Sequence, residues 1–144
     1  MKTDLMKAAD TLHIGDYTCV LYRRNEVYTS TERSVKPLLD WLDSGIDLKG
    51  FSAADKVVGK AAAFLYVFLG MKEVYAIVIS EAAIDTLERN GIQYRYDVSV
   101  RNIVNRAGTG NCPMEMAVWN IVDPKGALRA IRTKLKQLME KAGG

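Results

Sequence analysis

Three residue types are scarce in this sequence, and the small numbers of cysteine and histidine each remove a class of protein. The 144 residues contain two cysteines, three prolines and one histidine. Two cysteines are too few for the disulfide framework that holds many small secreted domains together, so we interpret Cys19 and Cys112 as reduced thiols. The single histidine, His13, has no acidic or thiol partner at the spacing of metal ligands, and we assign it no role.

Long apolar runs are also missing. The most apolar stretch, AAAFLYVFLGM (61–71), has lysines on both sides and is shorter than the about 20 residues that a membrane span requires. The first ten residues, MKTDLMKAAD, interrupt their apolar residues with charges, unlike the apolar centre of a secretory signal. We therefore expect a cytoplasmic protein without membrane contact.

Neither sign of charge dominates, since the formal net charge is +3. Much of the positive excess lies in the last predicted helix, where lysines and arginines surround an apolar series. No aromatic residues alternate with these charges to stack on bases, so we interpret the basic face as solvated and do not expect nucleic acid as a partner. A protein that associates with RNA through this basic helix is the weakest of the functional hypotheses.

The sequence contains the alternation of helices and strands that is typical of a single α/β domain over residues 1–144. Caps and periodicity predict helices at about 3–15, 35–42, 52–70, 81–90, 113–121 and from 123 onward, a hairpin at 17–31, and strands at 73–80 and 92–100. In this interpretation Ser52 caps a long central helix that stops at Gly70. The predicted fold is a three-layer α/β/α sandwich with a mixed sheet of four to five strands, on which the N-terminal and C-terminal helices pack.

Four features resemble a known family: the stretches ADKVVGKAAA, VISEAA and NRAGTGNCPMEM, and the order hairpin, helix, strand, helix. They are similar to a small uncharacterised prokaryotic family that has a cytidine-deaminase-like fold but lacks the deaminase metal site. The resemblance covers roughly residues 16–120. It implies a deaminase-like fold and no established reaction.

Zinc deaminases carry His-x-Glu at the start of the central helix and Pro-Cys-x-x-Cys at the start of a later helix. The corresponding stretches here read DKV (55–57) or GKA (59–61), and SEAA (80–83). They contain no histidine and no cysteine, so we expect no metal, no other cofactor and no zinc-dependent deamination.

The loop sequence AGTGNCPMEM (107–116) supplies the two candidate catalytic residues. Cys112 precedes Pro113, which suits the N-cap of a helix, where the helix dipole stabilises a thiolate. Its roles as a nucleophile, as a ligand contact and as a structural residue all stay open. Glu115 has the spacing of a capping-box acid that reaches back to the start of its own helix, and general acid or base chemistry is the alternative.

Candidate ligand contacts lie near other helix starts, because ligands of α/β sheets bind beyond the carboxyl ends of strands. Lys56 and Lys60 are one helical turn apart in the predicted central helix. Either Asp55 or an anionic ligand offsets their charge, or the two lysines are simply solvated. Ser80 is an N-cap whose hydroxyl could also hold a ligand oxygen. Arg106 is either a ligand clamp or a loop anchor.

These residues lead to two principal hypotheses. The first is a small enzyme or metabolite-binding protein for a polar, anionic ligand, with Cys112 as the candidate nucleophile. The second is a non-catalytic sensor or binding module that retains a pocket from a deaminase-like ancestor. The sequence leaves the substrate, the reaction and the oligomeric state open, although related folds often form oligomers.

Overall fold

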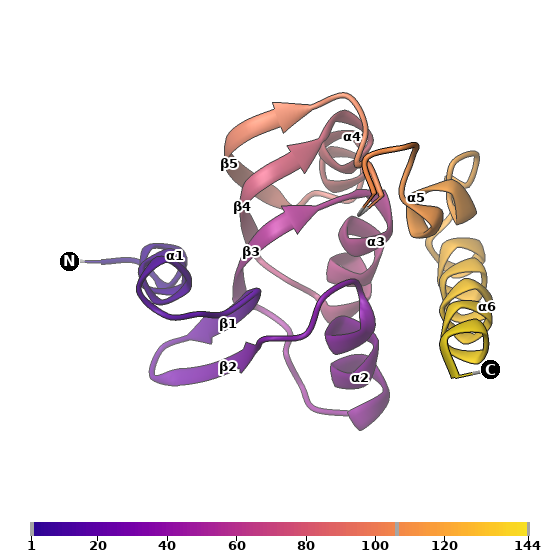
Figure 1. Ribbon diagram of the computed structural model, residues 1–144. Helices are drawn as coiled ribbons and strands as arrows, with labels where there is room; N and C mark the ends of the chain where they lie inside the picture. Colours follow the sequence, from indigo (N-terminus) through magenta and orange to yellow (C-terminus); the bar gives the residue numbers. More distant parts are fainter. Residues whose placement is uncertain (1, 106, 144) are drawn as a thin grey trace.

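The computed structural model describes residues 2–105 and 107–143, which form a five-stranded sheet with helices on both faces (Figure 1). The helices are α1 (Asp4–Ile14), α2 (Lys36–Ser44), α3 (Lys60–Leu69), α4 (Glu81–Arg89), α5 (Pro113–Ala117) and α6 (Pro124–Gly143). The strands are β1 (Cys19–Arg23), β2 (Glu26–Ser30), β3 (Ser52–Val58), β4 (Glu73–Ser80) and β5 (Gln93–Val100).

The sheet is mixed, in the order β2-β1-β3-β4-β5. β1 is antiparallel to both β2 and β3, whereas β3, β4 and β5 are parallel to one another. This arrangement confirms the predicted α/β class and the mixed sheet. The carboxyl ends of the three parallel strands lie at one edge, where α3 and α4 begin.

The prediction of one helix from Ser52 to Gly70 is wrong in its first part. Residues 52–58 form β3, which inserts between β1 and β4, and the helix begins only at Lys60. The alanines of this segment favour a helix locally, but strand pairing on both sides overrides that propensity. Asp55 and Lys56 therefore lie in a strand, and Lys56 shares no helix face with Lys60.

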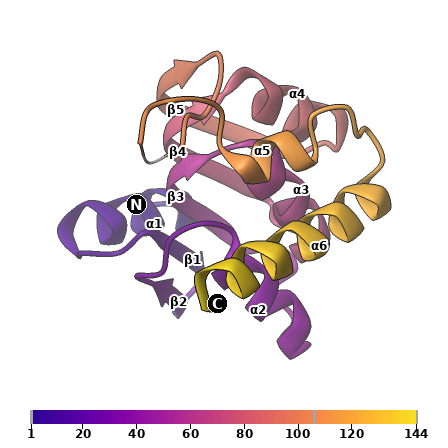
Figure 2. The ribbon, with the colours of Figure 1, turned by 45° about the vertical axis from the view of Figure 1, so that its right-hand side comes forward.

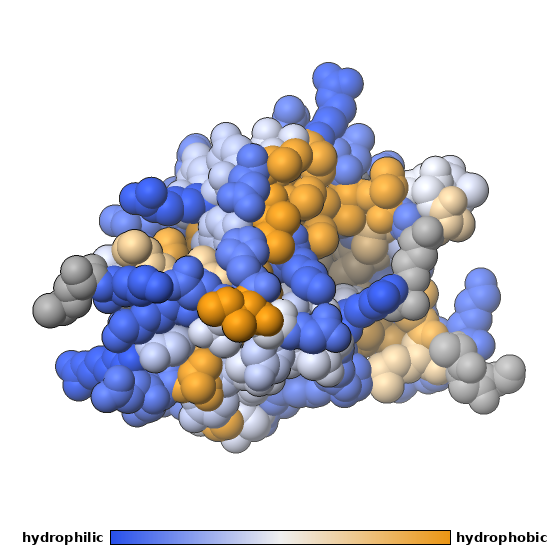
Figure 3. Space-filling model, turned by 60° about the vertical axis from the view of Figure 1, so that its left-hand side comes forward, coloured by the Kyte–Doolittle hydropathy of each residue, from blue (hydrophilic) through white to orange (hydrophobic). Residues whose placement is uncertain are grey.

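The two faces of the sheet are covered unequally. On one face α1 packs against β1 and β3 and, less closely, against β4. On the other face α2, α3 and α4 form a layer, and α6 lies beyond it against α3 and α5 (Figures 1 and 2). Figure 3, which looks onto the side with α1, shows hydrophobic residues at the surface. The exposed apolar residues include Val57 and Val98, which are in register through Val78.

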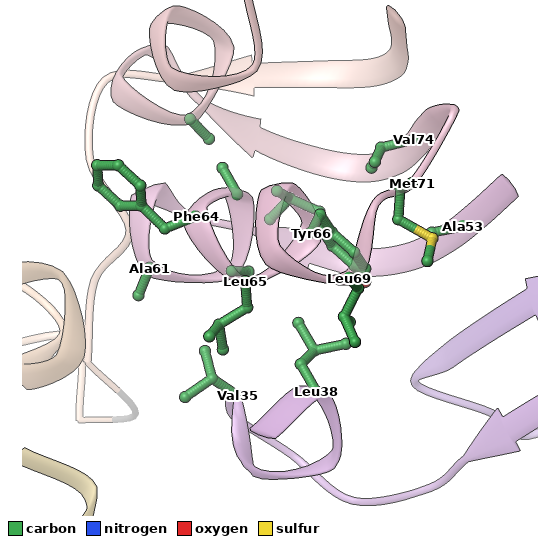
Figure 4. Packing of buried hydrophobic residues seen from close by; sticks show 14 of the residues in the cluster. Val35, Leu38, Ala53, Ala61, Phe64, Leu65, Tyr66, Leu69, Met71 and Val74 are labelled. Carbon is green, nitrogen blue, oxygen red and sulfur yellow. The ribbon is translucent and has the colours of Figure 1, made fainter. Parts of the chain in front are cut away.

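Helix α3 is the centre of the main core. Seven of its ten residues are buried, and its side chains fill the space between α2 and the sheet (Figure 4). Phe64, Leu65 and Tyr66 are at most 1% exposed. The apolar run 61–71 is thus a core helix, as its length predicts. In the described part of the chain, no helix is both long enough and apolar enough to cross a membrane.

Several local signals have the predicted effect. Gly70 ends α3 with a φ of 75°, a left-handed conformation that glycine adopts without steric cost. Ser80 caps α4 by accepting a hydrogen bond from the backbone N–H of Ala83 at 3.1 Å. In the turn of the β1-β2 hairpin, Arg24 has a positive φ of 55°.

Candidate pocket at the carboxyl edge of the sheet

A pocket of about 180 Å³ lies at the carboxyl edge of the parallel strands. Its lining combines the first residue of α3, the start of α4, the two residues after β5, and the α5 region. The lining residues are Lys60, Ser80, Ala82, Arg101, Asn102, Glu115 and Trp119. This is the edge at which open α/β sheets bind their ligands.

Glu115 joins α5 to the beginning of α3. Its carboxylate accepts hydrogen bonds from the backbone N–H groups of Lys60 at 2.6 Å and Ala61 at 3.0 Å. The predicted capping box within α5 is therefore wrong, because the carboxylate caps a different helix, 55 residues earlier in the chain. Burial raises the pKa of Glu115, while the two N–H groups and the Lys60 ammonium oppose that rise.

Lys60 supplies a partly desolvated cation to the pocket. Its Nζ donates to the backbone oxygen of Trp119 at 3.1 Å and lies 5.9 Å from the ring centre of Phe64. Burial lowers the pKa of Lys60, and the negative charges of Asp85 and Glu115 oppose that shift. An ammonium has three hydrogens, so the bond to Trp119 leaves donors for a ligand.

The remaining polar lining comes from Ser80, Arg101 and Asn102. The Ser80 oxygen accepts the capping bond of α4 but keeps its hydroxyl hydrogen to donate. Arg101 and Asn102 are exposed and follow β5 directly. Among the residues that line the pocket, two are cationic and one, Glu115, is acidic.

The structure brings together only some of the predicted site residues. Lys60, Ser80 and Glu115 line the same pocket, whereas Cys112, Asp55 and Lys56 do not line it. Arg106 lies outside the described residues. The sequence analysis missed Arg101, Asn102 and Trp119. The position of the first two directly after a strand could have identified them, but no sequence signal marked Trp119.

Cys112 is the N-cap of α5, as predicted, but its thiol makes no capping hydrogen bond. The side chain is half-buried and packs against the main core. Its backbone N–H donates to the carbonyl of Ile103 at 2.9 Å, and its carbonyl accepts from Met116 at 3.1 Å. These contacts hold the loop that delivers Glu115 three residues later.

Asp55 belongs to a separate, buried polar chain. The Tyr66 hydroxyl donates to Asp55 Oδ2 at 2.6 Å, and Cys19 Sγ lies 3.2 Å from the same hydroxyl. Burial raises the pKa of Asp55 to about 6 and raises the pKa of Cys19 well above its usual range. The chain connects α3 to β1 and β3, so it stabilises the core.

The structure also places His13 and the other potential metal ligands. His13 Nε2 lies 3.1 Å from the Tyr75 hydroxyl, which donates to Asp97 Oδ2 at 2.6 Å. Within residues 2–105 and 107–143, no three histidine, cysteine or acidic side chains are grouped closely enough to hold a metal ion.

Comparisons with known proteins place this chain in a family. Residues 7–135 match the family model described as TM1506, domain of unknown function DUF1893. The crystal structure of a DUF1893 family protein, TM1506 from Thermotoga maritima, superimposes with a TM-score of 0.81 at 25% sequence identity, covering 95% of this chain and 92% of that one. No curated protein matches the sequence. The chain belongs to the DUF1893 family, a domain of unknown function.

Proposed function

We propose that this protein binds a small anionic metabolite in the pocket at the carboxyl edge of the sheet. The observation that carries the proposal is the convergence of Lys60, Arg101 and the Ser80 hydroxyl on one pocket. The one acidic lining residue, Glu115, already has its charge engaged by two backbone N–H groups. The uncompensated side chains of the pocket are therefore cationic or hydrogen-bond donors, a combination that favours phosphate and carboxylate groups.

Binding is favoured over catalysis by the positions of the two candidate catalytic residues. Cys112 does not line the pocket, and each oxygen of Glu115 accepts a hydrogen bond from the main chain. A general base needs an oxygen within hydrogen-bond reach of the proton that it takes. The arrangement thus supports a binding or sensor module, the second hypothesis from the sequence, more than an enzyme with Cys112 as nucleophile.

The cytidine-deaminase-like relationship is part of the same proposal. It is supported by the meeting of two helix starts, α3 after β3 and α4 after β4, at one pocket. Zinc deaminases hold their metal ligands at the starts of two such helices. In this chain Glu115 already accepts hydrogen bonds from the main-chain N–H groups at the start of α3, so an anion in the pocket would be held by Lys60, Arg101 and the Ser80 hydroxyl.

Calorimetric titration with inorganic phosphate, acetate and phosphorylated sugars tests the proposal. We expect saturable binding that weakens by about tenfold or more in Lys60→Met and in Arg101→Met, because each loses a charge-assisted hydrogen bond. Lys56→Met is the matched control, since Lys56 is an exposed lysine outside the pocket. Absence of binding to all these anions at millimolar concentration, or equal weakening in the Lys56 variant, would overturn the proposal.

A further inference from the structure

Strand β5 leaves one edge of the sheet open. It is the last strand in the sheet order and pairs only with β4 among the described residues (Figure 1). Six of its eight side chains are exposed. Its sequence, QYRYDVSV, contains no lysine, proline or glycine, the residues that commonly prevent an edge strand from pairing. An edge of this kind is a template for another strand.

The sequence of β5 is complementary to itself when it is reversed about Tyr96. Antiparallel pairing with Tyr96 opposite Tyr96 of a second copy sets Arg95 opposite Asp97. The same register sets Tyr94 opposite Val98, and Gln93 opposite Ser99. Opposite charges and aromatic pairs are cross-strand neighbours that stabilise antiparallel sheets.

We propose that two copies of this chain form a dimer through antiparallel pairing of their β5 strands, with the two-fold axis at Tyr96. The two five-stranded sheets then form one continuous ten-stranded sheet. Because the axis is perpendicular to the sheet, the α4 helices of the two copies lie on the same face. This interface goes beyond the proposed ligand pocket and does not depend on it.

Contacts within a single copy already hold several β5 side chains on the faces that this pairing requires. Asp97 accepts the hydrogen bond from the Tyr75 hydroxyl, which holds its carboxylate on the face that carries α1. Arg95 is two residues away and shares that face. On the opposite face the rings of Tyr94 and Tyr96 are stacked, with centres 6.3 Å apart and planes 12° apart.

The charges also select this register among its neighbours. If the axis is shifted to residue 95, Arg95 faces Arg95 of the second copy. If it is shifted to residue 97, Asp97 faces Asp97 of the second copy. Like charges directly opposite each other destabilise a sheet. Self-complementary charge in one register is the reason that we assign the open edge to a second copy and not to an unrelated strand.

Charge reversal tests the interface by analytical ultracentrifugation. We expect the wild-type chain to be a dimer and Arg95→Glu to raise its dissociation constant at least tenfold, because two like-charged pairs face each other across the axis. The double variant Arg95→Glu with Asp97→Arg restores opposite charges and should recover the dimer. Lys72→Glu, an exposed reversal outside β5, is the control and should leave the dimer unchanged. A wild-type monomer, or a dimer that Arg95→Glu does not weaken, would overturn the proposal.

The double variant replaces Asp97 and so loses its hydrogen bond from Tyr75, which could prevent folding. Disulfide trapping tests the same dimer without changing Asp97. In a Cys112→Ser background, Tyr96→Cys lies on the axis and should form a covalent dimer under mild oxidation. Val98→Cys is the matched control, because the two side chains are 44% and 51% exposed. The two copies of residue 98 are about 13 Å apart in this register, too far for a disulfide. No covalent dimer from Tyr96→Cys, or equal yields from both variants, would refute the register.

Discussion

The carboxylate of Glu115 occupies the space that a side chain at Gly59 would need. A Cβ built on Gly59 would lie 2.4 Å from Cδ and from one carboxylate oxygen of Glu115. Gly59 is the N-cap of α3, and its φ of −97° is ordinary for any residue. The absence of a side chain at position 59 is therefore a packing requirement, which lets Glu115 reach the N–H groups of Lys60 and Ala61.

Gly59→Ala should destabilise the protein by about 1–3 kcal/mol, the usual range for overpacking a well-filled site. Part of this effect comes from alanine being a poorer N-cap than glycine. In a Glu115→Ala background the clash is absent, so Gly59→Ala should show only that capping part. The coupling measured in this double-mutant cycle by urea denaturation should reach about 1 kcal/mol or more.

Gly110→Ala is the control for this cycle. The nearest atom to an added Cβ at Gly110 is 4.0 Å away, and its backbone has no positive φ. We expect its free energy of unfolding to change by less than about 0.5 kcal/mol. Strictly additive effects of Gly59→Ala and Glu115→Ala would contradict the contact.

Asp55 should make the protein less stable as the pH rises from about 4 to about 6. Its pKa is raised to about 6 in the fold, so the folded chain holds a proton that the unfolded chain releases near pH 4. Stability falls with pH wherever the folded state binds more protons, here by on the order of 2–3 kcal/mol across that window.

Asp55→Asn removes this titration while its amide can still bond to Tyr66, so its urea stability should depend less on pH than that of the wild type. Some dependence should remain, since the pKa of Glu115 is also raised by burial. The control Asp16→Asn, at an exposed carboxylate, should keep the wild-type slope. An Asp55→Asn profile parallel to the wild-type profile between pH 4 and 7 would show that Asp55 titrates normally.

The two thiols should react in a fixed order with Ellman's reagent. Cys19 is 3% exposed and burial raises its pKa, so it is protected as long as the fold is intact. Cys112 is half-buried, and we expect it to be modified first in the folded protein. In a Cys112→Ser variant, the remaining thiol of Cys19 should react with the reagent only in denaturant. Rapid modification of that variant without denaturant would contradict the buried chain of Cys19, Tyr66 and Asp55.

Local sequence was sufficient for features that depend on neighbouring residues. Gly70 ends α3 because the left-handed conformation is open to glycine, and Ser80 begins α4 because its hydroxyl reaches an N–H three residues later. The apolar run at 73–80 and the alternating residues at 92–100 likewise predicted the strands β4 and β5. The class of the fold follows from these signals.

Only the tertiary structure decided that residues 52–58 are a strand and that Glu115 caps α3. β3 gains its hydrogen bonds from β1 and β4, which come from distant parts of the chain and outweigh the helix propensity of its alanines. Glu115 has the capping-box spacing of its own helix, yet the donors that it satisfies belong to Lys60 and Ala61. Sequence spacing shows which groups a side chain can reach nearby, but folding decides which distant donors are brought closer.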